Sequence, residues 1–243
     1  CRRMSGTTQA LRPPGLHLMA LEGRAPAEAL ASLVLWPLLA RLAPRGDGHS
    51  VLVLPGLATP DASTALLRAF LRRQGWRAHG WRLGFNFGPR EGVIEACVER
   101  VRALQRESGR KVSLVGWSLG GVYARELSKV LPQAVRRVVT LGSPVGRRPH
   151  ATNARALYEF VGGKRAYAPE LMARLDEPTP VPCTSIYSRS DGVVHWRSSL
   201  QPPAEHAENV AVPASHTGMG MNPLVLRLVA ERLAQPEVPA AST

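Results

Sequence analysis

Residues 111–131 read KVSLVGWSLGGVYARELSKVL, and this stretch decides the fold. Its first part, KVSLV, is a short apolar run typical of a buried strand, and the part after Leu119 has the spacing of an amphipathic helix. Between them, Gly-Trp-Ser-Leu-Gly matches the G-x-S-x-G pattern of a nucleophile elbow. Glycines two residues before and two residues after Ser118 leave room for a tight turn. The stretch therefore predicts a strand, a serine on a sharp turn, and a helix.

Such a turn puts the Ser118 hydroxyl at the carboxyl end of its strand and beside the N-terminus of the following helix. Developing negative charge is stabilised there by backbone N–H groups and the helix dipole. A serine hydroxyl is a weak nucleophile at neutral pH and needs a base that is oriented by a third group. We therefore expect an acid and then a histidine further along the chain, each after a late strand.

The alternation of strand and helix continues through most of the sequence. We expect strands near residues 49–54, 76–83, 111–115, 135–141, 181–187 and 208–212. We expect helices near residues 61–75, 93–107, 119–131 and 222–234. Runs such as VLVL and VSLV lack polar alternation, which is typical of strands covered on both faces. The fold class is therefore α/β, with a mostly parallel sheet of about six strands and helices on both faces.

The same pattern divides the chain into three parts. Residues 1–48 are an N-terminal arm, rich in Gly, Pro and Arg as far as about residue 25, followed by a packing helix over residues 26–42. That helix is interrupted by Pro37, and it either packs on the core or forms an interfacial anchor. Residues 49–235 are the main domain, with an irregular insertion at about 145–180. Residues 236–243 are a C-terminal tail.

The expected acid and histidine are both present in the required order. The predicted strand VPCTSIYSRS leads directly into Asp191, which places a carboxylate at a strand end. The loop PASHTG follows the last predicted strand and carries His216 just before the terminal helix. Ser118, Asp191 and His216 are therefore the candidate catalytic residues.

Each of these placements has an alternative. In the alternative for Asp191, it caps a turn in Ser-Asp-Gly and Asp176 or Glu177 is the acid. His195 and His206 compete with the chosen histidine. However, His195 follows the acid too soon, and His206 precedes the last strand.

An oxyanion hole needs two backbone N–H groups. We expect one from Leu119, directly after the nucleophile. The other should come from the loop after the first strand, with Leu57 preferred and Gly56 second, although Pro55-Gly56 also suits an ordinary strand-ending turn.

Four residues are candidates for contact with a substrate: Gly56, Asn86, Trp117 and His195. Asn86 lies in the loop GFNFGP, which follows a predicted strand at the end of the sheet where open α/β sheets bind ligands. Its amide either lines the pocket or holds the turn.

Composition limits the partners. Lys+Arg exceeds Asp+Glu by 31 to 18, and 28 of the 31 basic residues are arginines, mostly single or paired. Zinc-finger spacing and the aromatic interleaving of single-strand binders are both absent from the sequence, so no specific nucleic-acid partner is expected. Arginine use together with abundant alanine is typical of GC-rich coding, yet a basic face with weak affinity for an anionic membrane stays open.

The cysteines and the chain start bear on the compartment. The chain has three cysteines, far apart, which gives no disulfide framework; Cys97 and Cys183 are expected to be buried as small hydrophobic residues. The printed residues contain no signal-peptide pattern, which favours a cytoplasmic location. No apolar run approaches the roughly 18 residues of a spanning helix.

Taken together, the motifs resemble the α/β-hydrolase superfamily, and within it small bacterial lipase- and esterase-like members. The matching pieces are VLVLPGL, VSLVGWSLGG, VVTLGSP, YSRSDGVV and SHTGM, spread over residues 50–235. The resemblance implies Ser118 as nucleophile, Asp191 as acid, His216 as base, and the insertion at 145–180 as a lid. The chain departs from the family in two ways. It has no His-Gly at the oxyanion loop, and it lacks the first strands of the fuller fold.

The resemblance implies hydrolysis of a small hydrophobic ester by two-step acyl transfer, with no metal or organic cofactor. Apolar residues of the insertion either line a pocket for acyl chains or only pack on the sheet. Transfer of the acyl group to an alcohol or amine would use the same acyl-enzyme. A non-catalytic binding protein on this scaffold, or a binder of anionic surfaces, would use the fold without the chemistry. The sequence leaves the oligomeric state open.

Overall fold

Six parallel strands form one sheet in the order β2-β1-β3-β4-β5-β6. The computed structural model describes residues 11–145, 152–153, 175 and 177–237 of the chain. The strands are β1 (Ser50–Leu54), β2 (Arg77–Gly80), β3 (Val112–Trp117), β4 (Val135–Leu141), β5 (Cys183–Tyr187) and β6 (Ala207–Ala211). The predicted parallel sheet of about six strands is therefore confirmed.

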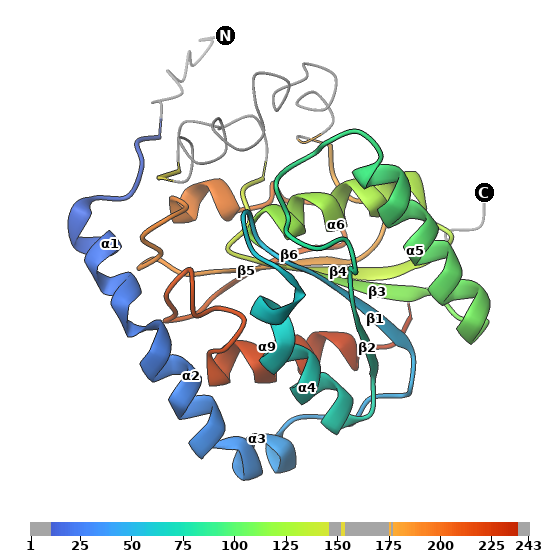
Figure 1. Cartoon of the computed structure of the whole chain (residues 1–243), viewed down its shortest axis with the longest axis horizontal. Coiled ribbons are helices and arrows are strands. Elements are labelled where there is room, and N and C mark those ends of the chain that lie inside the picture. Colours follow the sequence, from blue (N-terminus) through green and yellow to red (C-terminus); the bar gives the residue numbers. More distant parts are fainter. Residues whose placement is uncertain (1–10, 146–151, 154–174, 176, 238–243) are drawn as a thin grey trace, which may run out of the picture.

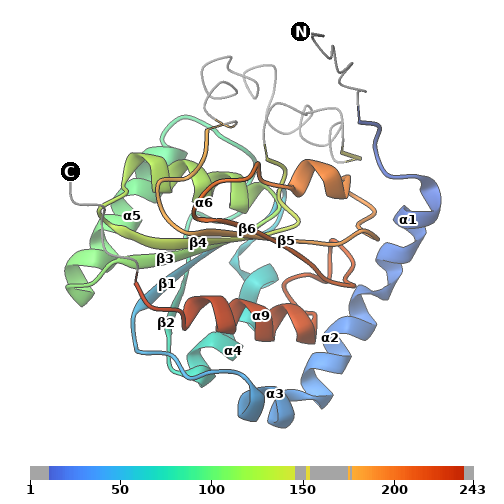
Figure 2. The same cartoon turned by 180° about the vertical axis from the view of Figure 1, so that it is seen from behind.

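Helices cover both faces of this sheet, as predicted. The longer ones are α4 (Ala65–Gln74), α5 (Val93–Ser108), α6 (Leu119–Val130) and α9 (Pro223–Leu233). Short 3₁₀ turns are η2 (Asp61–Thr64) and η4 (Trp196–Ser199). Helices α5 and α6 lie on one side of the sheet, and α4 and α9 lie on the other (Figures 1 and 2).

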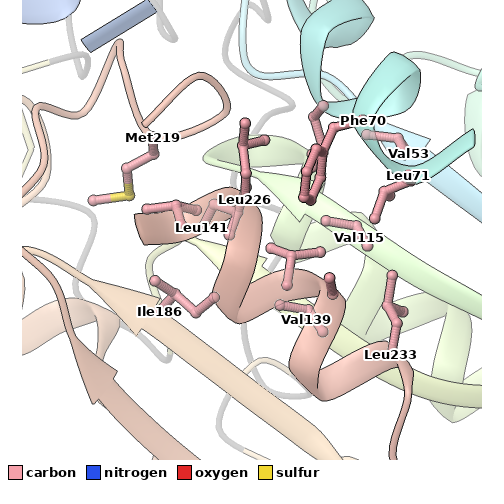
Figure 3. Close-up of a cluster of buried hydrophobic side chains, with 14 of the residues drawn as sticks. Val53, Phe70, Leu71, Val115, Val139, Leu141, Ile186, Met219, Leu226 and Leu233 are labelled. Carbon is pink, nitrogen blue, oxygen red and sulfur yellow. The ribbon is translucent and has the colours of Figure 1, made fainter. Parts of the chain in front are cut away.

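The alternation of side chains along each buried strand supplies two separate cores. In β1, Val51 and Val53 face the core under α4 and α9, whereas Leu52 and Leu54 face the core under α5 and α6. All four side chains are fully buried. Figure 3 shows part of the first core, where residues from β3, β4 and β5 meet α4 and α9. Burial on both faces explains why the run from Val51 to Leu54 in β1 is wholly apolar.

Residues 16–42 form a chain of short helices: α1 (Leu16–Leu21), η1 (Glu22–Arg24), α2 (Ala25–Val34) and α3 (Trp36–Leu42). The prediction of a loose arm as far as about residue 25 is wrong for residues 16–24, which are helical. The predicted interruption of the following helix is confirmed. The chain bends at Leu35, just before Trp36-Pro37, because a proline inside a helix cannot donate its backbone hydrogen bond. These helices run along one side of the molecule, with α3 close to α4 and α9 (Figures 1 and 2).

Two sequence predictions concern the remaining segments. Most of the insertion expected at 145–180, and residues 238–243 of the tail, lie outside the described residues.

Cys97 and Cys183 are both free thiols and almost fully buried, as expected of small hydrophobic residues. Burial raises the pKa of the Cys97 thiol to about 12, so the thiol stays protonated at neutral pH.

Candidate active site

Ser118 occupies a strained turn between β3 and α6. Its backbone has φ +52° and ψ −120°, a left-handed conformation that a residue with a side chain adopts only where the surroundings enforce it. A Cβ at Gly116 would collide with the backbone of Gly120, and one at Gly120 would collide with the backbone of Leu54. The two glycines are therefore required by close backbone approach, as the sequence pattern indicated.

The structure brings together the three residues that the sequence singled out. Ser118 Oγ lies 3.0 Å from His216 Nε2, and His216 Nδ1 lies 2.8 Å from Asp191 Oδ2. Asp191 and His216 are both nearly buried, at 2% and 4% exposure. When Nδ1–H donates a hydrogen bond to the carboxylate, Nε2 carries no proton and can accept the one from the serine hydroxyl.

The loop after β5 fixes the orientation of the acid. Asp191 Oδ1 accepts hydrogen bonds from the backbone N–H groups of Val193 at 2.8 Å and Val194 at 2.7 Å. Only Oδ2 is left to face the imidazole. Asp191 therefore caps the turn with one carboxylate oxygen and contacts the imidazole with the other.

The neighbours of His216 change the pKa of its imidazole. Burial lowers the pKa of His216, but the charge of Asp191, the hydrogen bond to that carboxylate and the charge of Glu22 outweigh burial. The net result is a pKa above the ordinary value for histidine. A raised pKa favours the imidazolium form, which is the form that a base reaches after it takes a proton.

Gly142, directly after β4, leaves room for this pair. Its φ of +55° is left-handed, and a Cβ there would lie 3.0 Å from His216 Nδ1 and 3.1 Å from Asp191 Oδ2. Sequence reasoning missed this residue. The signal was present in Leu-Gly-Ser-Pro, a glycine at the end of a central buried strand.

The two N–H groups predicted for an oxyanion hole are free to bind an anion. No described residue accepts a hydrogen bond from the backbone N–H of Leu119 or of Leu57. The loop that carries Leu57 passes close to the nucleophile, because a Cβ on Gly56 would lie only 3.4 Å from Ser118 Cβ. The position of this loop is compatible with the predicted role, which stays a prediction.

Asn86 holds that loop in place. It is fully buried, and its side-chain Nδ2 donates to the Pro55 carbonyl at 2.8 Å. Its backbone N–H donates to Thr59 at 3.0 Å, and its carbonyl accepts from Ala58 at 2.7 Å. Of the two readings left open by the sequence, these contacts favour the one in which Asn86 holds the turn.

The two other predicted substrate contacts have structural partners. The indole Nε1 of Trp117 donates to the backbone carbonyl of His216 at 2.9 Å, and thereby holds the histidine loop. His195 caps η4 through its Nδ1 and lines a cavity of about 240 Å³ that also contacts Asp191. Ser118 is not among the residues that line this cavity. Contact of Trp117 or His195 with a substrate stays a prediction.

Comparison with solved structures identifies the architecture. The chain resembles Aspergillus fumigatus lipase B with a TM-score of 0.59 and 16% identity, over 82% of this chain but only 57% of that longer protein. It resembles the mature form of a Bacillus licheniformis lipase with a TM-score of 0.58 and 15% identity, over 78% and 94% of the two chains. A third neighbour is an alpha/beta hydrolase enzyme from a metagenome of lagoon sediments, with a TM-score of 0.54 and 18% identity over 77% of this chain and 91% of that one. The chain has the α/β-hydrolase fold.

Comparison of sequences adds nothing to this assignment, since no family model and no curated protein matches the chain. Within the α/β-hydrolase fold the three candidate residues stand at the carboxyl ends of β3, β5 and β6. Among the described residues, no group of three or more His, Cys, Asp or Glu side chains could hold a metal ion.

The N-terminal helices supply contacts that sequence reasoning missed. Glu22 Oε1 accepts hydrogen bonds from the backbone N–H groups of Gly192 at 2.8 Å and His216 at 2.9 Å. Glu28 accepts from the backbone N–H of Ser215 at 2.8 Å and from its hydroxyl at 3.0 Å. Because residues 1–25 were read as a loose arm, nothing in the sequence pattern linked Glu22 to the site.

A second Ser-His-Asp cluster lies at the opposite end of the sheet. His49 Nε2 lies 2.8 Å from Ser113 Oγ, and its Nδ1 contacts Asp47, whose other oxygen pairs with Arg136 at 2.7 Å. His49 and Ser113 are fully buried. Burial lowers the pKa of His49, and the hydrogen bond that its imidazole donates to Asp47 only partly offsets this effect. In this cluster, at the amino ends of β1 and β3, the serine hydroxyl is therefore buried, and only the Asp47 side chain is exposed.

We predict that Asp191→Asn lowers the pKa of His216, because the carboxylate charge and its hydrogen bond are the two strongest effects that raise it. An NMR titration of the imidazole in both proteins measures the change. Glu231→Gln is the control, since that carboxylate pairs with Arg227 on the surface of α9 and should leave the titration of His216 where it is. An identical midpoint in wild type and Asp191→Asn would contradict the electrostatic account.

Proposed function

We propose that this protein is a serine hydrolase that cleaves carboxylic esters, with Ser118 as nucleophile, His216 as base and Asp191 as the acid that orients the base. The observation that carries the proposal is the 3.0 Å contact between Ser118 Oγ and His216 Nε2, made by a serine with a left-handed backbone. Strain of this kind at a serine between a strand and a helix is typical of a nucleophile elbow. The lipases among the structural neighbours add support at the level of the fold.

In the proposed reaction, His216 Nε2 takes the hydroxyl proton while Ser118 Oγ attacks the ester carbonyl carbon. The carbonyl π electrons move onto oxygen, and the tetrahedral intermediate collapses when His216 returns the proton to the leaving alcohol. Water, deprotonated by the same imidazole, then attacks the acyl-enzyme and releases the carboxylic acid. Asp191 stabilises the imidazolium at each step and holds Nδ1–H in the orientation that keeps Nε2 toward the serine.

The oxyanion formed in each step needs donors that are already in position. The N–H of Leu119, at the first residue of α6, and the N–H of Leu57 are the proposed pair. The helix N-terminus adds favourable partial charge at this point. Asn86 contributes indirectly, because its three hydrogen bonds fix the loop from Pro55 to Thr59 before any substrate arrives. Preorganised donors of this kind are worth about 10²–10³ in rate.

Hydrophobic acyl or alcohol groups are the proposed substrate class. Leu83 and Phe85, in the loop after β2 at the carboxyl end of the sheet, are 37% and 53% exposed, unlike the buried residues of the strands. Two of the structural neighbours are named as lipases, which supports the same substrate class. Exposed apolar side chains at the end of the sheet that carries the proposed nucleophile favour ligands with both an apolar part and an ester group.

We predict that Ser118→Ala lowers the rate of ester hydrolysis by about 10³-fold or more, because the acyl-enzyme cannot form. The measurement is initial-rate hydrolysis of p-nitrophenyl butyrate, together with labelling by a fluorophosphonate probe. Ser113→Ala is a matched control: Ser113 Oγ also contacts a histidine, at 2.8 Å, but it is buried at the far end of the sheet. Equal activity in Ser118→Ala and wild type, or labelling that persists in Ser118→Ala, would refute the serine mechanism.

We predict that activity on p-nitrophenyl esters rises from acetate to butyrate and longer acyl chains, since each added methylene removes apolar surface from water. The measurement is kcat/KM over the series at constant pH. A strict preference for acetate would contradict the hydrophobic substrate class and would leave the serine mechanism intact.

A further inference from the structure

Exposed apolar side chains are concentrated on the N-terminal helices. Of the 13 large hydrophobic residues that are exposed among the described residues, nine lie between residues 16 and 42. These nine, which we call the apolar strip, are Leu16, Met19, Leu21, Leu30, Leu33, Val34, Leu35, Leu38 and Leu42. Their exposure ranges from 39% at Leu35 to 83% at Leu16. Concentration of this kind marks an interaction surface.

The polarity of α2 is the reverse of an ordinary surface helix. The residues that face the domain are small or polar: Ala25 and Ser32 are buried, and Ser32 Oγ donates to the carbonyl of Met221. The leucines lie on the outside. A helix that needed only water around it would carry charged residues there and leucines inside.

The charges around the apolar strip complement an anionic surface. Glu22 and Glu28 are the only acids between residues 11 and 46, and both are turned inward to accept hydrogen bonds from the loops of the candidate site. Arg12, Arg41 and Arg45, in contrast, are exposed. The outer surface of this segment is therefore apolar with basic residues near both ends, in a chain whose net charge is +13.

We propose that the apolar strip docks on an anionic lipid membrane and lies in the plane of its surface. Apolar side chains in the headgroup boundary with arginines beside them are the features that such binding requires. Among the described residues, no single helix is long and apolar enough to cross a bilayer, and the pair Leu16–Val34 and Trp36–Leu42 passes that test only together, across a bend of 67°. The inward hydrogen bonds of Glu22, Glu28 and Ser32 keep these helices on the domain, which favours lying on the membrane over crossing it.

Docking of the apolar strip would bring the candidate site to the lipid surface. Helix α1 packs against the acid loop so closely that a Cβ on Gly192 would collide with the carbonyl of Leu18. A protein held by α1 and α2 therefore presents the loops of Asp191 and His216 beside the membrane, where hydrophobic esters collect.

The test is co-sedimentation of the purified chain with vesicles of phosphatidylglycerol and phosphatidylcholine, compared with vesicles of phosphatidylcholine alone. We expect binding to the anionic vesicles that weakens at 1 M salt. The variant L30Q/L33Q/L38Q should bind about a hundredfold more weakly, because each half-exposed leucine contributes about fivefold. The control V130Q changes a residue that is 46% exposed at the end of α6, on the opposite side of the sheet from α9, and should bind like wild type.

This measurement uses no substrate, so its result is independent of the proposed hydrolysis. Absence of binding to anionic vesicles by wild type would overturn the proposal, as would equal binding by L30Q/L33Q/L38Q. Sedimentation analysis without lipid covers the other occupant: a wild-type dimer that becomes a monomer in L30Q/L33Q/L38Q would assign the strip to a second copy of the chain. Thermal unfolding of each variant establishes that it is folded.

A different observation carries a second inference, which rests on the proposed function: we infer that Glu22 is a positioning residue for the acid and the histidine. Its Oε1 accepts from Gly192 and His216, and its Oε2 accepts from the backbone N–H of Thr217 at 2.9 Å and from the Thr217 hydroxyl. One carboxylate thus joins the residue after Asp191 to the histidine and the residue that follows it.

The charges around His216 distinguish Glu22 from its neighbours. Asp191 and Glu22 are the carboxylates whose charges raise the pKa of His216. Glu28 and Arg24 lie on the same side, but they pair with each other at 3.0 Å. Hydrogen bonds from Thr217, His216 and Gly192 more than offset the effect of burial and hold the pKa of Glu22 below its ordinary value. Glu22 is therefore ionised at neutral pH, and removal of its charge lowers the pKa of the imidazole.

Glu22→Gln tests this role in two ways. NMR should give a lower pKa for His216 and faster hydrogen exchange at the Gly192 and Thr217 amides, whether or not the protein hydrolyses esters. In the kinetics, kcat should fall about tenfold or more through misplacement of the base. Because only the neutral imidazole acts as base, the acid limb of kcat/KM should move to lower pH.

Glu28→Gln is the matched control, since Glu28 bonds to Ser215 in the same loop but does not raise the pKa of His216. It should leave the acid limb and the titration unchanged. Identical titration and amide exchange in Glu22→Gln and wild type would overturn the inference. Failure of the fluorophosphonate to label wild type would instead count against the proposed hydrolysis.

Discussion

The position of the His216 imidazole is the constraint on which the candidate site depends. Three other residues fix His216. Asp191 holds the ring at Nδ1, the Trp117 indole binds the backbone carbonyl of His216, and Glu22 binds its backbone N–H. A side chain at Gly142 would intrude on it. These contacts come from different parts of the chain, so the imidazole reaches Ser118 only when the sheet, the loop after β6 and the N-terminal helices are all in place. The geometry of the candidate site is a product of the tertiary fold, and local sequence supplies only the turn at Ser118.

The second Ser-His-Asp cluster makes the same point by contrast. Ser113, His49 and Asp47 repeat the pairwise contacts of the candidate site at the amino end of the sheet, where the serine and the histidine are buried and the aspartate is exposed. There the pKa of His49 is lowered, with burial as the main cause, whereas that of His216 is raised. Ser113 lies within β3 and has no left-handed backbone, whereas Ser118 has a left-handed backbone beside a helix N-terminus. Contact geometry alone therefore does not distinguish a reactive serine; strain, position at the carboxyl end and access do.

How far the sequence predicts this protein follows from where each signal resides. The strands and the elbow were predictable because apolar runs and paired glycines are local, and strand order placed Asp191 and His216 at the correct end of the sheet. Gly142 and Glu22 were not, since their importance lies in contacts with residues far away in the chain. The segment from residue 16 to 24 was misread as an arm for a related reason. Gly15, Gly23 and the nearby prolines dominate its composition, while the carboxylate that holds it to the domain has partners some 170 to 195 residues away.

The N-terminal helices combine two features that are usually separated. Glu22 and Glu28 turn toward the loops and use the inner face for hydrogen bonds to backbone N–H groups, because a carboxylate withdrawn from water without such partners would be destabilising. Their leucines therefore gain little from packing on the domain, and most of them lie outside. An apolar outer face is unfavourable in water, so a helix with this pattern is expected to persist where something apolar covers it. A lipid surface would cover this apolar face. The inward carboxylates meanwhile hold the same helices to the loops of Asp191 and His216, so the proposed membrane contact lies next to the proposed catalytic residues.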